Sequence, residues 1–547
     1  MSEENPSSED ETPSNAFEPV VIGEQLTPED VVAVAREGAR VVIGDQARER
    51  VEQSRERVES VIDSGEAVYG INTGFGELVT ERIPPEKLED LQTNLIRSHA
   101  AGTGETLQRS VVRAMMVSRL QALAMGYSGV RPVVLEQLKA MLNEGVHPVV
   151  RSRGSLGASG DLAPLSYLAL VLVGEGEAQV DGYESPLAGE EALATANLEP
   201  LELASKEGLA LINGTQLTTG LGALAVVDAQ TLLDTADAAG ALTTEVTMGS
   251  TVASSEAIGA VRPHPGQRVS AANVRRLTAN SGIVESHRNC DRVQDAYSIR
   301  CLPQVHGAAR DAVSHLRDAV TTELNSATDN PLIFDPDALD PRTSQTDDAA
   351  VVSGGNFHGA PLAHRLDYAA RALTDVAAMS ERRIDRLLNP NLQEPHLPPF
   401  LSTESGVESG LMIAQYTAAS LVTECREAGT AGTDTIPVSG GQEDHVSMSA
   451  TAAFGLESVV DRLASVLAIE LLCGTEAAEY VEDSLSHGVG TQVVSEMIRE
   501  HVEALSADRR LDGDIDTITT LVSNGTLRSG VQETLSEGFV SRGQKDS

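Results

Sequence analysis

Four long segments in the C-terminal part of the sequence constrain the fold most, because each carries apolar residues at three- and four-residue spacing. They are Gly307–Asn325, Pro361–Leu388, Ser409–Glu427 and Ser449–Cys473. This spacing is typical of helices that bury one face against a neighbour. Short connectors rich in glycine and proline separate them, and the sequence shows no internal repeat and no β–α–β alternation. We therefore predict a mainly α fold, a long helical bundle with a smaller mixed α/β N-terminal part.

Three segments are predicted along the chain. Residues 1–18 are rich in serine, glutamate, proline and asparagine, which is typical of a disordered acidic tail. Residues 19–215 form the smaller N-terminal part, which starts with a short strand at Val20–Ile22. Residues 216–547 form the central and C-terminal helical bundle, and both parts are expected to make one continuous functional unit.

The chain is strongly acidic throughout its length. Against 81 aspartates and glutamates stand 40 lysines and arginines, which gives a net charge of −41. Because salt screens the repulsion among such charges, we expect a halophilic protein in a high-salt cytoplasm. The same charge argues against nucleic acid or an anionic membrane as a partner. The longest apolar stretch, Leu162 to Val173, is too short to span a bilayer, and the N-terminus does not resemble a signal peptide.

A glycine-rich loop at Gly154–Leu162 leads into this apolar stretch. On the residues alone, three simple interpretations compete. A phosphate-binding loop would continue with Gly-Lys-Ser/Thr, which this one does not. A flexible linker would leave Asp161 as the cap of the next helix. Finally, the tripeptide Ala158-Ser159-Gly160 could be a chance combination in a chain with 47 glycines.

Seven motifs spaced along the chain change this interpretation when they are taken together. They are Tyr69–Gly76, Leu91–Ala100, Gly154–Leu165, Ile212–Thr215, Gln294–Arg300, Gly354–Gly359 and Gln442–Met448. Each is weak alone. In this order they resemble the aromatic amino acid ammonia-lyase family, and the resemblance covers nearly the whole chain from about residue 20.

The resemblance implies that the backbone of Ala158, Ser159 and Gly160 cyclises into 4-methylidene-imidazol-5-one, a cofactor made by self-modification. The Gly160 nitrogen must approach the Ala158 carbonyl closely, which glycine permits because it has no Cβ. Ser159 must lose its hydroxyl as water to leave an exocyclic methylidene, which acts as an electron sink. By the same resemblance, Asp161 assists the cyclisation and Phe357 packs against this cofactor loop, which lies in the N-terminal part.

The resemblance also assigns roles toward the substrate. Tyr69 is the base that removes the β-proton. Its phenolate must then be favoured by nearby positive charge or hydrogen bonds. The alternative is a buried core tyrosine with no catalytic role. Arg300 clamps the substrate carboxylate, whereas the alternative is a surface salt bridge. On a helix, Tyr297 shares the face of Arg300, with Gln294 about one turn further along as a second substrate-binding residue. Tyr297 and Asn213 stabilise the forming oxyanion and the substrate amine.

Two motifs bear on which amino acid is the substrate. Ser98-His99 and Gln442-Glu443 resemble the histidine-specific branch of the family. A carboxylate at Glu443 can accept the imidazole N–H while His99 meets the other nitrogen, and a phenyl ring would leave both unpaired. The alternative for Glu443 is an acidic residue at a helix start with no role in binding. His99 is ambiguous, because a histidine there also suits a tyrosine-specific pocket. We therefore favour histidine as the substrate, with tyrosine second.

The predicted reaction is the non-oxidative elimination of ammonia from L-histidine to give trans-urocanate, the first step of histidine degradation. An aminomutase with the same cofactor and a non-catalytic scaffold of the same fold are the alternatives. The family implies a homotetramer with shared sites. In that arrangement Tyr69, the cofactor loop and Asn213 come from one subunit, Tyr297 and Arg300 from a second, and Phe357 from a third.

A rival set of residues could suggest zinc: His287, Cys290, Cys301 and His306. Their spacing fits no common finger or ribbon, and the residues between them belong to the Gln294–Arg300 motif. We therefore expect no metal, and we expect reduced thiols in a cytoplasmic protein.

Overall fold

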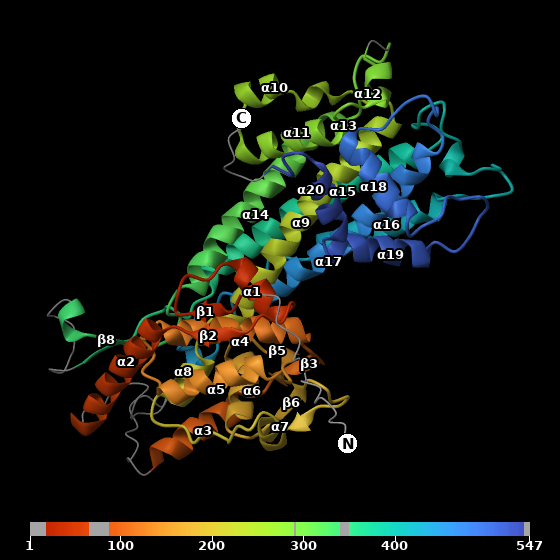
Figure 1. Ribbon diagram of the computed structural model, residues 1–547. Helices are drawn as coiled ribbons and strands as arrows, with labels where there is room; N and C mark the ends of the chain where they lie inside the picture. The colour runs from red at the N-terminus through yellow and green to blue at the C-terminus, as the bar shows by residue number, and fades with distance from the viewer. Residues whose placement is uncertain (1–17, 65–86, 289–290, 340–348, 541–547) are drawn as a thin grey trace, which may run out of the picture. The chain divides into compact units, whose positions relative to one another are not determined.

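The structure is a computed structural model that describes residues 18–64, 87–288, 291–339 and 349–540. These residues are mainly helical, which confirms the predicted fold class (Figure 1). The predicted tail at residues 1–18 lies outside the described residues except for Glu18. Contacts group the chain into two compact units. The first comprises Met1–Ala223, Thr321–Gly359 and Ile436–Val446, and the second comprises Leu224–Val320, Ala360–Thr435 and Ser447–Ser547. The predicted boundary at residues 215 and 216 stays a prediction about sequence segments.

The first unit combines short sheets with helices. Its strands are β1 (Val20–Ile22), β2 (Val41–Ile43), β3 (Thr103–Thr106), β4 (Val146–Pro148), β5 (Arg151–Arg153), β6 (Glu177–Val180), β7 (Leu187–Ala188), β8 (Leu332–Phe334) and β9 (Ala350–Val352). The β1–β2 pair is parallel, and the pairs β3–β5, β4–β6, β6–β7 and β8–β9 are antiparallel. A mixed α/β N-terminal part is therefore present, as predicted.

The helices of this unit include one that is buried along nearly its whole length. They are α1 (Pro28–Ala35), α2 (Asp45–Ser64), α3 (Leu88–His99), α4 (Arg109–Ala124), α5 (Pro132–Asn143), α6 (Leu162–Leu172), α7 (Gly189–Thr195), α8 (Glu207–Ile212) and the first turns of α9 (Gln216–Val246). In α4 every residue from Val111 to Ala124 is buried, which makes this helix the centre of the unit's core. Two arginines, Arg113 and Arg119, are buried within it.

The second unit is a bundle of helices. Besides the rest of α9, it contains α10 (Glu256–Val261), α11 (Pro265–Leu277), α12 (Gly282–Ser286), α13 (Tyr297–Arg300), most of α14 (Leu302–Leu324), α15 (Ala360–Leu388), α16 (Met412–Glu427), α17 (Ser449–Ala478), α18 (Val489–Arg499), α19 (Asp512–Ser523) and α20 (Thr526–Thr534). Helices α15 and α17 run side by side, and α16 and α19 pack against α17 (Figure 1). All four helices predicted from apolar spacing are present as α14 to α17.

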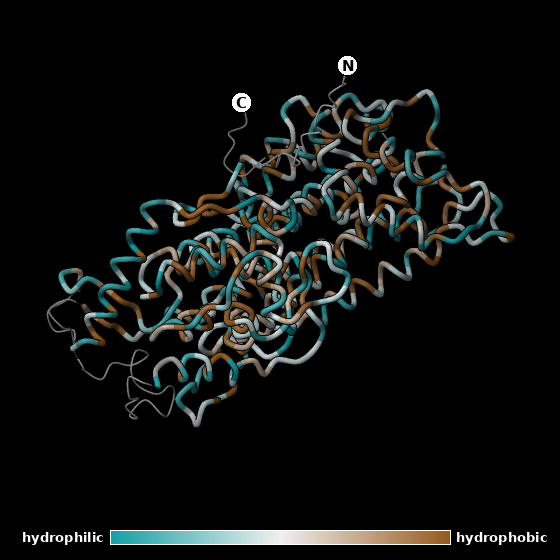
Figure 2. The backbone as a smooth tube through the Cα atoms, turned by 60° about the horizontal axis from the view of Figure 1, so that its bottom comes forward, coloured by the Kyte–Doolittle hydropathy of each residue, from teal (hydrophilic) through white to brown (hydrophobic). Residues whose placement is uncertain are grey.

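Apolar and polar positions alternate along the helical turns of the chain, as the colours of the backbone tube show (Figure 2). This is the pattern expected where one helical face packs inward and the other meets solvent. Of the helices in the described part of the chain, none has both the length and the apolar character needed to cross a bilayer.

Candidate active site

The glycine-rich loop at residues 154–162, predicted to form the cofactor, connects β5 to α6 and turns sharply at its glycines. Gly160 has a φ of +74°, a conformation that favours glycine. A Cβ at this position would lie 2.1 Å from the carbonyl oxygen of Gly214. The two glycines form an isolated β-bridge, and the Asp161 N–H donates to the Gly214 oxygen at 2.6 Å. At Gly160 the loop is therefore packed directly on the Asn213-Gly214 turn. The predicted approach of the Gly160 nitrogen to the Ala158 carbonyl stays a prediction.

Asn213 holds the serine of the tripeptide. It follows α8 directly and is buried, and its Nδ2 donates to the Ser159 carbonyl oxygen at 2.9 Å and to the Ser159 Oγ at 3.1 Å. Its Oδ1 is also buried and has no hydrogen-bond partner among the residues that the structure describes. A buried acceptor without a partner is uncommon, and it fits a site that receives a donor from another molecule.

Asp161 lies beneath the loop and is fully buried. Its carboxylate accepts hydrogen bonds from the Ser155 Oγ at 2.7 Å, the Thr218 N–H at 2.9 Å and the Thr218 Oγ1 at 3.2 Å. Burial raises the pKa of Asp161, while these hydrogen bonds act to lower it. Although Asp161 occupies the N-cap position of α6, its side chain makes no capping bond. Its carboxylate instead ties the loop to the first turn of α9, so the interpretation of Asp161 as a simple cap is wrong.

A second, partly buried carboxyl, that of Glu323, lies near Asp161, and no sequence motif marks it. The Thr215 Oγ1 donates to the Glu323 Oε1 at 2.6 Å. Burial raises the pKa of Glu323, and the charge of Asp161 raises it further. Nothing local distinguishes Glu323 in the sequence, because it belongs to the regular helix α14.

The structure brings His99 and Glu443 together within the first unit. His99 ends α3, and its Nδ1 lies 2.8 Å from the Leu95 carbonyl oxygen. Because a carbonyl only accepts, Nδ1 carries a proton, which leaves Nε2 for a further partner. Burial raises the pKa of Glu443, and the charge of the nearby His99 lowers it. Since α17 begins only at Ser449, Glu443 does not belong to the start of that helix.

The Phe357 motif contacts the Glu443 motif. The rings of His358 and His445 stack with centroids 5.7 Å apart and an interplanar angle of 4°. The His358 Nε2 lies 3.3 Å from the His445 carbonyl oxygen. Phe357 itself is half-buried, and its predicted packing against a cofactor loop, assigned to another subunit, stays a prediction.

Tyr297 and Arg300 lie on the short helix α13 of the second unit. The Arg300 Cζ lies 4.5 Å from the centroid of the Tyr297 ring, so both side chains share a face as predicted. The Arg300 Nε is buried without a hydrogen-bond partner in the described part of the chain. The predicted helical placement of Gln294 is wrong, because α13 begins only at Tyr297.

Tertiary contacts explain why the chain is not helical at Gln294. The neighbouring Asp295 accepts from the Ser250 N–H at 2.8 Å and from the Arg292 Nη1 at 3.0 Å. The Arg292 Nη1 also donates to the Thr247 and Met248 carbonyl oxygens at 3.1 Å each. These bonds tie the segment before α13 to residues 247–250, and residues 291–296 form no helix.

The remaining candidates are placed as follows. Tyr69 and Cys290 lie outside the described residues. His306, from the rival metal set, is fully buried and bonds through Nδ1 to the Asp237 Oδ1 at 2.8 Å. In the described ranges, no three His, Cys, Asp or Glu side chains are grouped so that they could hold a metal ion.

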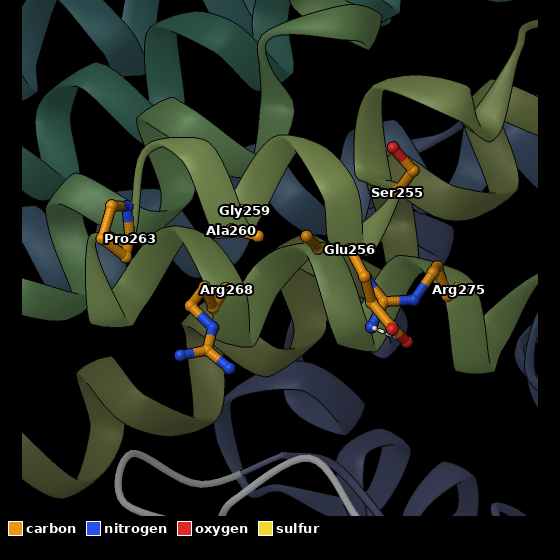
Figure 3. A pocket seen from close by; sticks show the side chains of 8 residues that line it. Ser255, Glu256, Gly259, Ala260, Pro263, Arg268 and Arg275 are labelled. Atoms are coloured by element: carbon orange, nitrogen blue, oxygen red, sulfur yellow. Dashed lines mark hydrogen bonds and ion pairs between the residues drawn. The ribbon is translucent and has the colours of Figure 1, made fainter.

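The second unit also contains a pocket of about 290 Å³ between α10 and α11 (Figure 3). Arg275 spans its wall, donating to the Ser254 carbonyl oxygen at 2.6 Å and to the Glu256 Oε1 at 3.3 Å. The lining residues are Ser255, Glu256, Gly259, Ala260, Pro263, Arg268, Ala271 and Arg275. None of the candidate residues that the structure describes lines this pocket, so it is separate from the predicted chemistry.

Comparisons with known proteins show which family and which proteins the chain is similar to. The family described as aromatic amino acid lyase matches residues 26–500. A "Probable histidine ammonia-lyase" of Halobacterium salinarum is 58% identical over 516 residues, which are 94% of this chain and 98% of that protein. The structure of tyrosine aminomutase from Streptomyces globisporus matches with a TM-score of 0.88 and 37% identity, covering 95% of this chain and 100% of that one. Histidine ammonia-lyase from Trypanosoma cruzi matches with a TM-score of 0.86 and 37% identity, covering 97% and 100%.

Proposed function

The chain belongs to the aromatic amino acid lyase family, and we propose that it eliminates ammonia from L-histidine to give trans-urocanate. The observation that carries the choice of substrate is the proximity of Glu443 to His99. An imidazole ring offers two nitrogens, and this pair presents one partner to each. A phenyl ring in the same place would leave both partly buried groups unpaired, which selects against it. The similarity to histidine ammonia-lyases supports the same substrate.

The proposal includes a cofactor made from Ala158, Ser159 and Gly160, namely 4-methylidene-imidazol-5-one. The local structure fits this group, because Gly160 is packed where a Cβ has no room and Ser159 is held through two of its oxygens. When formed, the group supplies an electrophilic methylidene that no standard side chain offers. The Asn213 Oδ1, which is buried without a partner among the described residues, accepts a hydrogen bond from the substrate amine in this proposal. The Asp161 carboxylate fixes the loop by its hydrogen bonds with Ser155 in the loop and Thr218 in α9.

In the remaining proposed roles, each part of the substrate is bound or attacked by a different side chain. Arg300 binds the carboxylate, since its planar guanidinium can form two parallel hydrogen bonds with it. Gln294 assists in binding, and Tyr297 stabilises negative charge that develops near the loop. Tyr69 accepts the β-proton, and loss of the amine then leaves the double bond of the product. His99 holds the imidazole ring of the substrate in position during the reaction.

We propose that these residues meet in a cytoplasmic homotetramer, with Tyr297, Arg300 and Phe357 supplied by neighbouring subunits. The net charge of −41 supports a requirement for salt, because four such chains repel one another strongly where ions do not screen them.

A second candidate is favoured by one observation, the close structural match to a tyrosine aminomutase. An aminomutase would use the same loop and return the amine to the β-carbon. A histidine such as His99 can also meet a phenol.

Product analysis separates these functions. The purified chain is incubated in high salt with L-histidine or L-tyrosine, and urocanate, coumarate, ammonia and β-amino acids are measured. We expect urocanate and ammonia in equal amounts from histidine, and Ser159→Ala as the inactive control. A β-amino acid as the main product, or faster turnover of tyrosine, would overturn the proposal. The mass of the intact chain tests the cofactor separately, because its formation releases two waters.

A further inference from the structure

Arg119 lies in the middle of α4, outside every sequence motif, and is fully buried. We propose that Arg119 is a positioning residue for the cyclisation of the tripeptide, because it fixes the Asn213-Gly214 turn on which Ser159 and Gly160 rest. This inference rests on the proposed function, of which the self-made cofactor is a part.

The guanidinium of Arg119 forks around the end of α8. Its Nη1 donates to the Asn213 carbonyl oxygen at 2.9 Å and to the Gln216 Oε1 at 2.6 Å. Its Nη2 donates to the Asn213 carbonyl oxygen at 2.9 Å and also to the Ala210 carbonyl oxygen. The last carbonyls of a helix lack partners within the helix, and here one side chain binds two of them. A lysine ammonium cannot reproduce this planar arrangement of donors.

The turn that Arg119 holds is in direct contact with the loop. Gly214 has a φ of +147°, and a Cβ there would lie 2.6 Å from the Arg119 Nη1. On its other side, Gly214 accepts the Asp161 N–H, and Asn213 donates to both Ser159 oxygens. Arginine, turn and loop are therefore packed in series, and a shift in one of them displaces the next.

Cyclisation depends on this geometry more than on any external reagent. The Gly160 nitrogen bonds to the Ala158 carbonyl carbon, and that carbonyl oxygen leaves as water with the protons of the Gly160 and Ser159 N–H groups. A second water takes the Ser159 hydroxyl and the Ser159 α-proton. No oxidant or reductant is needed. The rate is therefore set by how closely the two backbone atoms are held, and Arg119 contributes by fixing the support beneath them.

Arg113 provides a matched control on the same helix. It is also buried, and it donates from Nε to the Val34 oxygen and from Nη1 to the Leu142 oxygen, both at 2.8 Å. Burial lowers the pKa of Arg113 and of Arg119 to about 10 in each case. Both arginines thus bind backbone carbonyls of the first unit from within α4, but only the bonds of Arg119 reach the Asn213-Gly214 turn.

The experiment compares Arg119→Lys and Arg119→Gln with Arg113→Lys and Arg113→Gln in the full-length chain. Each protein is synthesised in high salt, the folded fraction is isolated by gel filtration, and intact mass follows the loss of two waters over time. We expect the Arg119 variants to lose water roughly tenfold to a hundredfold more slowly than the wild type. The Arg113 variants should lower the melting temperature without slowing this loss.

A merely structural role for Arg119 would affect folding and leave the chemistry of the folded fraction unchanged. Folded Arg119 variants that lose both waters at the wild-type rate would therefore overturn the proposal. If Arg119→Gln gives no folded chain, Arg119→Lys decides, because it keeps the buried charge and changes only the donor geometry. A wild-type chain of full, unreduced mass would instead reject the cofactor assignment, and with it this inference.

Discussion

Replacing Gly160 with alanine tests the cofactor loop most directly. The backbone there has a φ of +74°, and the left-handed region costs an L-residue about 1–2 kcal/mol. The new Cβ would also lie 2.1 Å from the Gly214 oxygen and 2.3 Å from its carbonyl carbon. Both atoms belong to the backbone, so no side-chain rotation relieves the overlap. Overpacking of this kind adds about 1–3 kcal/mol and forces the loop away from the turn.

Gly38 is the matched control for this prediction. Its φ is +76°, nearly the same as that of Gly160, but apart from Gly38 and its two chain neighbours no described atom lies within 4 Å of the position of its Cβ. Gly38→Ala should therefore carry only the conformational cost of about 1–2 kcal/mol. Gly160→Ala should carry this cost and the steric cost together, and only Gly160→Ala should disturb the chemistry.

The assay measures intact mass, near-ultraviolet absorbance and thermal unfolding of both purified variants. The chain has no tryptophan, so absorbance of the cofactor would be read against a weak tyrosine background. We expect Gly38→Ala to lose two waters completely and Gly160→Ala to keep its full mass. A Gly160→Ala protein that forms the cofactor fully would refute the reasoning, because the close approach to Gly214 would then have no role.

Three further predictions concern the substrate and the assembly. Burial raises the pKa of Glu443, so its carboxylate is lost as the pH falls through a value above that of an ordinary glutamate; histidine turnover should decline there. Glu443→Gln should lower histidine turnover at neutral pH about tenfold or more, and its turnover should no longer decline at this acidic pH. Unchanged kinetics would mean that Glu443 has no role in binding. Dilution from molar salt should lower the melting temperature and dissociate the assembly, and a melting temperature independent of salt would contradict the predicted halophilic character. Ser159→Ala and Arg300→Ala should each be inactive, yet co-refolding should restore some activity, since mixed tetramers contain sites with neither defect; inactive mixed tetramers, verified by mass, would count against shared sites.

The helical part of the fold could be predicted from the sequence because its signal is local. Apolar spacing in Pro361–Leu388 and Ser449–Cys473 reflects one buried face per helix, and α15 and α17 pack together along such faces. Where tertiary contacts override local preference, the prediction failed. Gln294 illustrates this, since its segment forms no helix and its neighbours Asp295 and Arg292 bond to the Thr247–Ser250 region.

The candidate site could be predicted only where a family motif marks it. The motifs mark Ser159, Asn213 and Asp161. In the structure the Asn213 side chain donates to the Ser159 Oγ, and the Asp161 N–H donates to the carbonyl oxygen of Gly214, the residue after Asn213. Arg119 and Glu323 carry no such mark. Their partners lie far away in sequence, on α8 and at the start of α9, so neither spacing nor composition could reveal them.

The placement of the loop explains why its supports should control its chemistry. Glycines with positive φ let the chain turn tightly, but they also leave it many conformations before folding, so order must come from elsewhere. At one end β5 pairs with β3, and at the other α6 is buried along nearly its whole length. Beneath the loop, Asn213 and Asp161 bind its backbone and side chains, and Arg119 binds the turn. In the proposed cyclisation, these supports would order the reacting segment when the unit folds. Variants of these supports should therefore slow ring formation even where the tripeptide is intact.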